Sequence, residues 1–411
     1  MSGNPIESDL SDAQGDNHGT KQIVMTERYP GREIQHPCPY SQQERISKRR
    51  RNMFRIEMLP ARHGDCLWIE YGELAAPRRI LIDGGTSGTY QDLKKRFEAI
   101  PEAQREFELL VVTHIDADHI SGVLKLLESD LPGVRFKDIW FNGWRHLPES
   151  PLESLGPVQG ERLTDLLVKP DYPWNLAFKG QAAKTEENGR AEYRDLEDGM
   201  RLTLLSPNQA KLAKLNPVWE REVKAAGLDP NRMQPELEEE DTRPSPLERL
   251  GSDNLPDIDA LADSVFEEDS SEANGSSIAL LAQYQDHSAL LSGDAHPGLL
   301  EHAIDCLLTQ KQEDVLSIDL FKLPHHGSKA NISRELLDKL ACDRYLISTS
   351  GAYFKHPDQA AIARVIKYGG DMPSLLFNYV TKYKSGSRGS LTPSPHNTLH
   401  AAPHRAFHLE W

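Results

Sequence analysis

Cysteine is scarce in this sequence, and long apolar runs are missing. The 411 residues include only four cysteines, which are far apart and form no Cys-x-x-Cys pair: Cys38, Cys66, Cys306 and Cys342. This spacing excludes a disulfide framework and a cysteine-rich zinc knuckle, and it predicts reduced thiols in a cytoplasmic protein. No apolar stretch approaches the ~20 residues of a membrane-spanning helix, and the polar N-terminus resembles neither a secretory leader nor a transit peptide. We therefore expect a globular protein that does not enter a membrane.

Negative charge is abundant but unevenly distributed. The formal net charge is −16, and residues 236–272 alone contain fourteen acidic residues and two arginines. Because this stretch also contains proline and serine, we predict a disordered acidic insertion over 217–273, with one short helix near Asp257–Phe266. Residues 1–52 lack apolar periodicity, which predicts a disordered tail. Its basic run, 48–51, could contact nucleic acid, but a solvated linker is the favoured interpretation. The rest of the chain, 53–411, is predicted to form the folded domain.

Short apolar strands followed by polar residues dominate the folded part. The stretches "CLWIEYG" (66–72), "RRILIDGG" (78–85) and "ELLVVT" (108–113) are typical of strands, and "HISGVLKLLES" (119–129) has the spacing of an amphipathic helix. A loop-rich excursion is expected over 145–195. A second block of strands follows: "SSIALLAQYQ", "SALLSGD", "IDLFKLPHHGS" and "RYLISTSG". Two blocks of strands, each with helices, predict an α/β fold with two sheets.

Four potential metal ligands follow the third of these strands in "THIDADH": His114, Asp116, Asp118 and His119. In an extended turn, residues 114, 116 and 118 can converge on one face while His119 begins the helix. Imidazole and carboxylate groups at this spacing can hold two divalent metal ions. The alternative is purely structural, with Asp118 capping the helix and His114 hydrogen-bonded in the core.

Two further strands end in groups that can bind metal. Asp294 follows an apolar strand in "LLSGD", where its carboxylate can bridge two ions. His325 and His326 follow "LFKLP", and Gly327 behind them allows close backbone approach. Each motif alone is compatible with an ordinary turn. Three such clusters at strand ends in one chain favour a single metal site built from all of them.

Together these motifs resemble those of the metallo-β-lactamase-fold metallohydrolases. "RRILIDGG" is similar to the first motif of that family, "THIDADH" to the second, "SGD" to the fourth and "PHHGS" to the fifth. The resemblance implies a four-layer αβ/βα sandwich of two mixed sheets with outer helices and metals at one edge. It also implies that Asp83 supports the metal-binding loop without binding metal itself.

The sequence departs from the family pattern at two places. Asp116 stands where a second histidine is usual, and "NGSS", with Asn274 and Ser277, stands where the third motif has its histidine. Both departures resemble the soluble nuclease domain of bacterial DNA-uptake (competence) channel proteins. That pattern also includes a later His-Pro pair, which His356-Pro357 matches. The resemblance therefore adds Asn274, Ser277 and His356 as residues near the metals or the substrate.

The resemblance implies two metal positions. The first would use His114 and Asp116, with Asn274 or water. The second would use Asp118, His119, and either His325 or His326, with Asp294 bridging the two ions. The other histidine of the pair would face the substrate, and the sequence does not distinguish the two. Carboxylate and amide ligands in place of imidazole favour Mn²⁺ or Mg²⁺ over Zn²⁺.

A two-metal site makes hydroxide available near neutral pH and stabilises charge at phosphorus. The resemblance to the DNA-uptake nuclease domain implies a phosphodiester substrate, so a metal-dependent phosphodiesterase is expected. A cytoplasmic nuclease acting on DNA or RNA is the first hypothesis, with Asp118, His325 and His326 as its catalytic groups. The alternatives are hydrolysis of a small ester or phosphoester, such as a lactone or a phosphocholine ester, and a catalytically inactive binding module. The intact ligand set disfavours the inactive module.

The acidic insertion has two interpretations. As a polyanion mimic it could cover the active-site groove until a regulatory protein or a protease displaces it. Such control would suit a nuclease of bacterial anti-phage defence. Alternatively, the insertion is a solvated loop that binds no partner.

Overall fold

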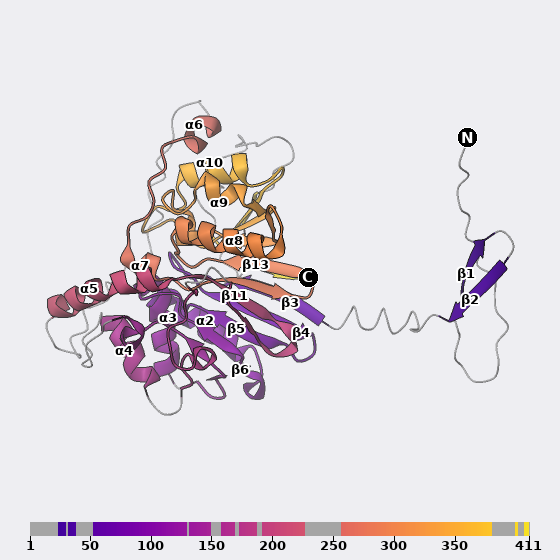
Figure 1. Ribbon diagram of the computed structural model, residues 1–411. Helices are drawn as coiled ribbons and strands as arrows, with labels where there is room; N and C mark the ends of the chain where they lie inside the picture. The colour runs from indigo at the N-terminus through magenta and orange to yellow at the C-terminus, as the bar shows by residue number, and fades with distance from the viewer. Residues whose placement is uncertain are drawn as a thin grey trace. The chain divides into compact units, whose positions relative to one another are not determined.

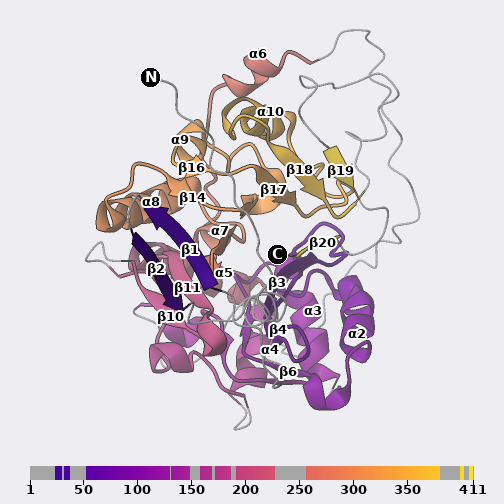
Figure 2. The same ribbon diagram turned by 90° about the vertical axis from the view of Figure 1, so that its right-hand side faces the viewer.

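In the computed structural model, the structure describes residues 24–29, 32–37, 52–129, 131–148, 158–168, 172–186, 191–226, 256–379, 399–401 and 407–410. The chain divides into two compact units, Met1–Asn52 and Met53–Trp411, and each is considered by itself (Figures 1 and 2).

The first unit contains a strand pair where the sequence predicts a disordered tail. Strands β1 (Val24–Tyr29) and β2 (Arg32–Pro37) are antiparallel. The turn-forming pair Pro30-Gly31 stands between them in the sequence, and both strands contain residues that favour β structure. These local signals outweigh the polar composition of the segment. The other predicted tail residues lie outside the described part of the chain.

Six strands form the first mixed sheet of the second unit, in the order β20-β3-β4-β5-β7-β9. β4 and β5 are antiparallel, whereas β5, β7 and β9 are parallel. The strands are β3 (Asn52–Met58), β4 (Leu67–Glu73), β5 (Arg78–Ile82), β7 (Leu109–Val111), β9 (Ile139–Trp140) and β20 (Phe407–Glu410).

Eight strands form the second mixed sheet, in the order β10-β11-β12-β13-β15-β17-β18-β19. The first four are antiparallel, and those from β13 onward are parallel. The strands are β10 (Tyr193–Asp195), β11 (Arg201–Ser206), β12 (Ala279–Tyr284), β13 (His287–Leu291), β15 (Leu320–Lys322), β17 (Arg344–Ile347), β18 (Ser374–Phe377) and β19 (Leu399–Ala401). Two short parallel pairs join β6 (Glu106–Phe107) to β8 (Arg135–Phe136), and β14 (Leu316–Ser317) to β16 (Leu340–Ala341).

The two sheets pack face to face, because alternate side chains of each strand point in opposite directions. In β4, Leu67, Ile69 and Tyr71 join the core between the sheets, whereas Trp68 joins the core under the helices. Figure 1 shows α2, α3 and α4 on one side of the sheets and α8, α9 and α10 on the other. The predicted four-layer arrangement of two mixed sheets with outer helices is therefore confirmed.

The α-helices of the outer layers differ in length. They are α2 (Tyr90–Glu98), α3 (Ala117–Glu128), α4 (Val158–Leu167), α5 (Gln209–Ala226), α6 (Ile258–Ala262), α7 (Glu272–Gly275), α8 (Pro297–Lys311), α9 (Arg334–Asp338) and α10 (Gln359–Tyr368). Short 3-10 helices are η1 (Ser87–Thr89), η2 (Glu102–Gln104), η3 (Trp144–His146), η4 (Leu176–Phe178), η5 (Glu197–Gly199) and η6 (Pro324–Gly327). Among the helices that the structure describes, none combines the length and apolarity needed to cross a membrane.

The excursion over 145–195 is more regular than predicted. It contains α4, whose Leu163 and Leu167 are buried, and Trp174, which stacks on Phe141. These few apolar residues bury one face of the segment against the first helical layer, although their number is too small to give a clear period in the sequence.

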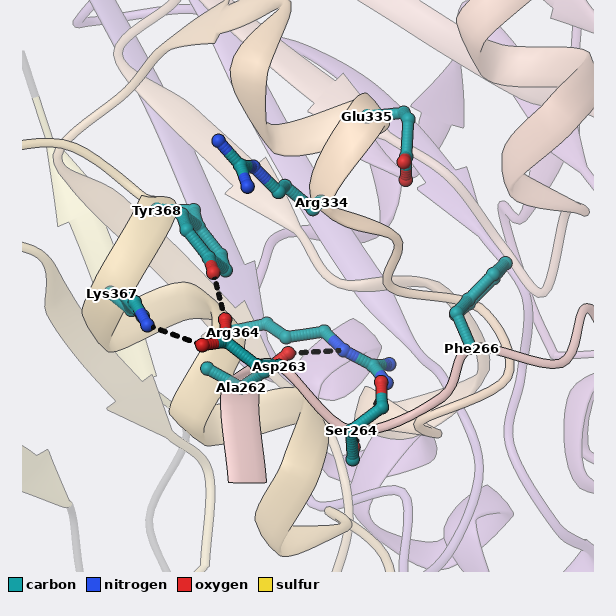
Figure 3. A pocket seen from close by; sticks show the side chains of 9 residues that line it. All are labelled: Ala262, Asp263, Ser264, Phe266, Arg334, Glu335, Arg364, Lys367 and Tyr368. Carbon is teal, nitrogen blue, oxygen red and sulfur yellow. Dashed lines mark hydrogen bonds and ion pairs between the residues drawn. The ribbon is translucent and has the colours of Figure 1, made fainter. Parts of the chain in front are cut away.

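The acidic insertion predicted over 217–273 is structured at both ends. α5 extends to residue 226, and the predicted short helix is present as α6. α6 is attached to α10, where Arg364 donates to the carbonyl oxygen of Ala262 and Lys367 pairs with Asp263 (Figure 3). Lys367 also pairs with Asp259. The short helix predicted near Asp257–Phe266 is thus confirmed, whereas the prediction of disorder is wrong for residues 267–273, where Asp269 accepts a bond from Asn274 and lies 3.4 Å from His325 Nδ1. Residues 227–255 lie outside the described part of the chain.

Candidate metal centre

The candidate ligands follow the ends of strands that run parallel within each sheet. Asp83 follows β5 and His114 follows β7 in the first sheet, while Asp294 follows β13 and His326 follows β15 in the second. Because the carboxyl ends of parallel strands lie at the same edge of a sheet, these four side chains are brought to one edge of the sandwich. His119 joins them from the first turn of α3.

Asp83 holds the loop that carries the histidines. Its backbone is left-handed, with φ 58°, and its carboxylate accepts bonds of 2.7 and 2.8 Å from the backbone N and Oγ1 of Thr113. The same carboxylate lies 2.8 Å from Nδ1 of His119, and Thr113 Oγ1 lies 3.0 Å from Nδ1 of His114. With Nδ1 engaged in this way, Nε2 is the nitrogen that each ring turns toward the cluster.

Four side chains converge closely enough to surround one ion. His119 Nε2 lies 3.3 Å from Asp294 Oδ2, and His326 Nε2 lies 3.3 Å from Asp118 Oδ2 and 3.6 Å from Asp294 Oδ2. Ligands bound at about 2.1 Å in tetrahedral geometry lie about 3.4 Å apart. The spacing of these atoms therefore fits a metal ion between them, and groups of three among these residues and their neighbours have their ligand atoms within 4.8 Å of one another.

His114 and Asp116 lie beside this group on its open side. His114 Nε2 is 3.6 Å from Asp116 Oδ2 and 3.9 Å from Asp294 Oδ2. The side chain of Asp116 is 43% exposed, whereas that of His114 is fully buried. Below, "ligand cluster" denotes six residues: His114, Asp116, Asp118, His119, Asp294 and His326.

Several buried atoms of the ligand cluster make no hydrogen bond. They are Nε2 of His114, His119 and His326, together with Oδ1 of Asp294. Buried polar atoms without partners are costly, so their convergence on one spot favours a bound cation. The structural alternative for "THIDADH" is not supported, because Asp118 lies inside α3 rather than at its N-cap and His114 keeps Nε2 without a hydrogen bond.

Asp65 and Lys322 belong to the same site, although sequence reasoning did not single them out. Lys322 is fully buried, with Nζ paired to Asp65 Oδ2 and 4.0 Å from Asp294 Oδ1. Burial alone would raise the pKa of Asp65, but the charges of Lys322 and His326 lower this pKa to about 2. A lysine inside the apolar strand "LFKLP" is the signal that could have pointed to a buried acidic partner.

The electrostatics of the cluster favour positive charge at the histidines. Burial alone would lower the pKa of His119, but Asp294, Asp83 and Asp118 outweigh it and raise this pKa well above its usual value. For His326, burial is outweighed by Asp294 and Asp65, which raise the pKa to about 9. Divalent cations can supply the same positive charge in place of protons.

The two neighbouring histidines 325 and 326 lie in different surroundings. His326 is fully buried in the ligand cluster, and its Nδ1 lies 2.9 Å from the carbonyl oxygen of Ser348. The side chain of His325 is 24% exposed, and its Nδ1 lies 3.0 Å from Asn331 Oδ1 and 3.4 Å from Asp269 Oδ2. Both histidines have a left-handed backbone, which turns their rings apart.

The structure places the remaining predicted site residues around His325 and Asp294. Asn274 donates to Asp269 and lies 3.3 Å from His325 Nδ1, rather than beside His114 and Asp116. Ser277 Oγ accepts a bond from the backbone N of Asp294, and the ring of His356 lies 5.2 Å from that of His325. Asp269 and Asn331, which hold His325, were missed, because Asp269 was assigned to the disordered insertion and Asn331 follows no strand.

Residues 61–184 match the Metallo-beta-lactamase superfamily. This segment includes the Asp83 turn and all of "THIDADH", so the family match and the first half of the ligand cluster coincide. A superfamily match together with a buried His/Asp cluster suggests a metal-dependent hydrolase that uses divalent ions. A comparison with curated proteins finds no match.

Solved structures give weaker similarities. The metallo-beta-lactamase fold protein YhfI from Bacillus subtilis has a TM-score of 0.41 and 9% identity, over 88% of this chain and 100% of its own. CmlA, a diiron beta-hydroxylase from Streptomyces venezuelae, has a TM-score of 0.36 and 12% identity, over 92% of this chain and 55% of its own. The metallo-beta-lactamase SMB-1 has a TM-score of 0.27 and 11% identity, over 76% of this chain and 95% of its own. Similarities of this size say nothing about the activity of this chain.

Proposed function

We propose that this protein is a metal-dependent phosphodiesterase that cleaves nucleic acid. The observation that carries the proposal is the convergence of three buried imidazole Nε2 atoms, none of them hydrogen-bonded, with the carboxylates of Asp118 and Asp294. Such a donor set suits divalent cations, and a pair of them supplies an activated water nucleophile and charge stabilisation at phosphorus.

Two ion positions are assigned from the distances. Asp118, His119 and His326 would hold the first ion, His114 and Asp116 would hold the second, and Asp294 would be shared by both. The second position is the more open one because the Asp116 side chain is half-exposed. It is therefore the position at which a substrate oxygen has most room.

The charge of the site supports two ions rather than one. One buried lysine, Lys322, faces five carboxylates that lie in or beside the ligand cluster. These carboxylates belong to Asp65, Asp83, Asp116, Asp118 and Asp294. The excess of four negative charges, one of them on the half-exposed Asp116, equals the charge of two divalent cations. Buried charge without compensation is strongly unfavourable, so the site is balanced best with both ions bound.

His325 is assigned as the group that faces the substrate. Asn331 and Asp269 occupy its Nδ1, so Nε2 is the atom that can give a proton to the leaving oxygen. Asp269 balances the positive charge of the protonated ring. Burial alone would lower the pKa of His325, but Asp269 and Asp294 raise it above its usual value, which favours the proton donor form.

The nuclease assignment rests on the pattern of the site residues. His-x-Asp-x-Asp-His, Asn-x-x-Ser, Gly-Asp and Pro-His-His-Gly-Ser followed by His-Pro resemble the soluble nuclease domain of DNA-uptake channel proteins. The hard ligands Asp116 and Asp118 suit Mn²⁺ or Mg²⁺, which are common partners of phosphate chemistry.

The test is to purify the full chain, measure its bound metal, and assay labelled DNA, labelled RNA, bis-nitrophenyl phosphate and a lactone with Mn²⁺, Mg²⁺ and Zn²⁺. Cleavage of nucleic acid with Mn²⁺ or Mg²⁺ is expected. Hydrolysis of the lactone without cleavage of any phosphodiester would replace the proposal by the small-ester alternative.

The Asp116→His variant tests the ligand argument within the same assay. Imidazole at this position should shift the preferred activator from Mn²⁺ towards Zn²⁺, because it is the softer ligand. An unaltered protein with maximal activity in Zn²⁺ alone would contradict this assignment.

A further inference from the structure

Two exposed aromatic side chains stand on the loop that leads into the site. Tyr353 and Phe354 are 53% and 46% exposed. The His63 ring stacks on Tyr353 at 4.9 Å and meets Phe354 edge-on at 5.6 Å, and the two aromatic rings contact each other at 4.6 Å. These three residues, His63, Tyr353 and Phe354, are called the aromatic rim below.

Ring contacts connect the aromatic rim to the ligand cluster. Phe354 stacks on His356 at 6.1 Å, His356 meets His325 at 5.2 Å, and His325 meets His326 at 6.0 Å. The rim therefore lies beside the histidine that we assign to the leaving group, on the exposed side of the site.

Backbone packing fixes the rim in place. The backbone N of Ser350 donates to the carbonyl oxygen of Arg62, and the N of Asp65 donates to that of Asp118. Gly64 lies so close to Asp118 that a Cβ there would be 1.7 Å from the Asp118 carbonyl oxygen. The loop that carries His63 is thus packed directly against a member of the ligand cluster, and the His63 ring in turn contacts Tyr353 and Phe354.

Two lysines accompany the exposed rings in the sequence. Lys355 adjoins Phe354, and Lys329 follows the "PHHGS" turn, whereas the Arg62 guanidinium packs against Gly88. Within the part of the chain that the structure describes, neither lysine forms an ion pair with a carboxylate. Exposed rings together with cationic side chains are the combination that binds single-stranded nucleic acid, by base stacking and phosphate contact.

We propose that the aromatic rim stacks a nucleobase next to the scissile phosphate, which makes unpaired or single-stranded nucleic acid the substrate. This proposal rests on the phosphodiesterase function proposed above. In a duplex each base is already stacked on its neighbours, so only a free strand or a frayed end can place a base on the rim.

The test compares substrates that differ only in their bases. Wild type, Tyr353→Ala/Phe354→Ala and the ring-preserving Tyr353→Phe are assayed on a single-stranded oligonucleotide, its duplex and an abasic strand of equal length. Tyr193→Ala, which removes a 49% exposed aromatic from β10, is the matched control. We expect the double variant to raise KM for the single strand by about 10- to 100-fold. The double variant should change little in its kcat or in its KM for the abasic strand. Tyr353→Phe and the Tyr193→Ala control should have nearly the wild-type KM for every substrate.

Several results would overturn the proposal. One is an unchanged KM of the double variant for the single strand. Another is an equal rise of its KM for the abasic strand, which would show that the rim contacts the sugar-phosphate backbone rather than a base. A change of oligomeric state in the double variant with KM unchanged would assign the rim to a protein contact instead.

The experiment distinguishes an error in the proposed phosphodiesterase function from an error in the proposed stacking role of the rim. If wild type cleaves no phosphodiester, fluorescence anisotropy of the labelled single strand with Mn²⁺-loaded protein still measures stacking. Weaker binding by the double variant would then support the rim while the proposed function falls. Equal binding of the single strand by wild type and the double variant would contradict both the phosphodiesterase function and the stacking role of the rim.

Discussion

The ligand cluster and the aromatic rim belong to one candidate site, yet they differ in burial and in the elements that carry them. Apart from Asp116, no member of the ligand cluster is more than 8% exposed, and each follows a strand or begins a helix. Tyr353 and Phe354 are about half-exposed and lie on a loop. Buried charges depend on one another for compensation, whereas exposed rings would each contact the proposed substrate separately. Substitutions should therefore have all-or-none effects in the cluster and graded effects at the rim.

The largest effect is expected for Asp118→Ala. Removing this carboxylate takes away the oxygen that lies 3.3 Å from His326 Nε2, and with it one ligand of the first ion position. Metal content should fall, and phosphodiesterase activity should drop to background, because no activated water is formed. Elemental analysis and hydrolysis of bis-nitrophenyl phosphate measure the two quantities. Unchanged cleavage by a well-folded Asp118→Ala protein would falsify the metal mechanism.

The adjacent residues His325 and His326 allow a buried metal ligand to be compared with a group that faces the substrate. His326→Gln should lose bound metal, because His326 lies in the ligand cluster. His325→Gln should keep the metal and lower kcat by about 10²- to 10⁴-fold, the usual contribution of a general acid. Metal content and kcat measured on both variants separate the roles. The reverse pattern, with metal lost only in the His325 variant, would exchange the two assignments.

A smaller effect is expected for Asp83→Asn. Asp83 supports Thr113 and His119 without joining the ligand cluster, so its loss should weaken metal affinity by about 10- to 100-fold rather than abolish binding. Thr113→Val is the comparison variant: it removes the 2.8 Å bond to Asp83 and the 3.0 Å contact with His114 Nδ1, but it leaves the contact of Asp83 with His119. Titration with Mn²⁺ measures the affinities. A loss in the Thr113 variant at least as large as that in Asp83→Asn would show that support of His119 by Asp83 is not the main contribution.

The smallest effect is expected for the acidic insertion. Residues 227–255 contain eight acidic residues and three arginines, and their deletion leaves α6 and Asp269 in place. If the acids repel polyanions, deletion should raise cleavage of long nucleic acid several-fold at low salt but not that of bis-nitrophenyl phosphate. The difference should shrink near physiological salt, where the Debye length is about 8 Å. A same-length replacement of these acids by amides separates charge from length. If neither substrate responds, the segment is a tolerated loop.

The sequence predicted those site residues that directly follow a recognisable strand. "THIDADH", Asp294 and the histidine pair each follow a strand that is recognisable from its own residues, so their convergence could be expected from the fold class. Asp65 and Lys322 could not be paired in this way, because they come from different sheets and meet only after the sandwich has packed. The roles of His325 and His326 also stayed open, since they depend on two successive left-handed residues.

Composition was a poor guide to the end of the acidic insertion, residues 267–273, although the short helix predicted before it is present as α6. A dense run of acids predicts self-repulsion, but the count does not reveal partners elsewhere in the chain. Lys367 on α10 pairs with Asp259 and Asp263, and Asp269 receives the amide of Asn274 at 2.7 Å. Tertiary pairing therefore reversed the prediction at the very segment that reaches His325.

Because α6 is held on α10, and α5 is held under the first sheet by Leu212, Leu215 and Trp219, both sides of residues 227–255 are fixed to the domain independently of the chain between them. A cut within this stretch would divide the protein into two fragments that remain associated. One fragment would carry Asp83 and "THIDADH", and the other Asp294 and His326, so the metal centre would be completed only when the two polypeptides meet. The same position would also accept new termini in a circular permutant.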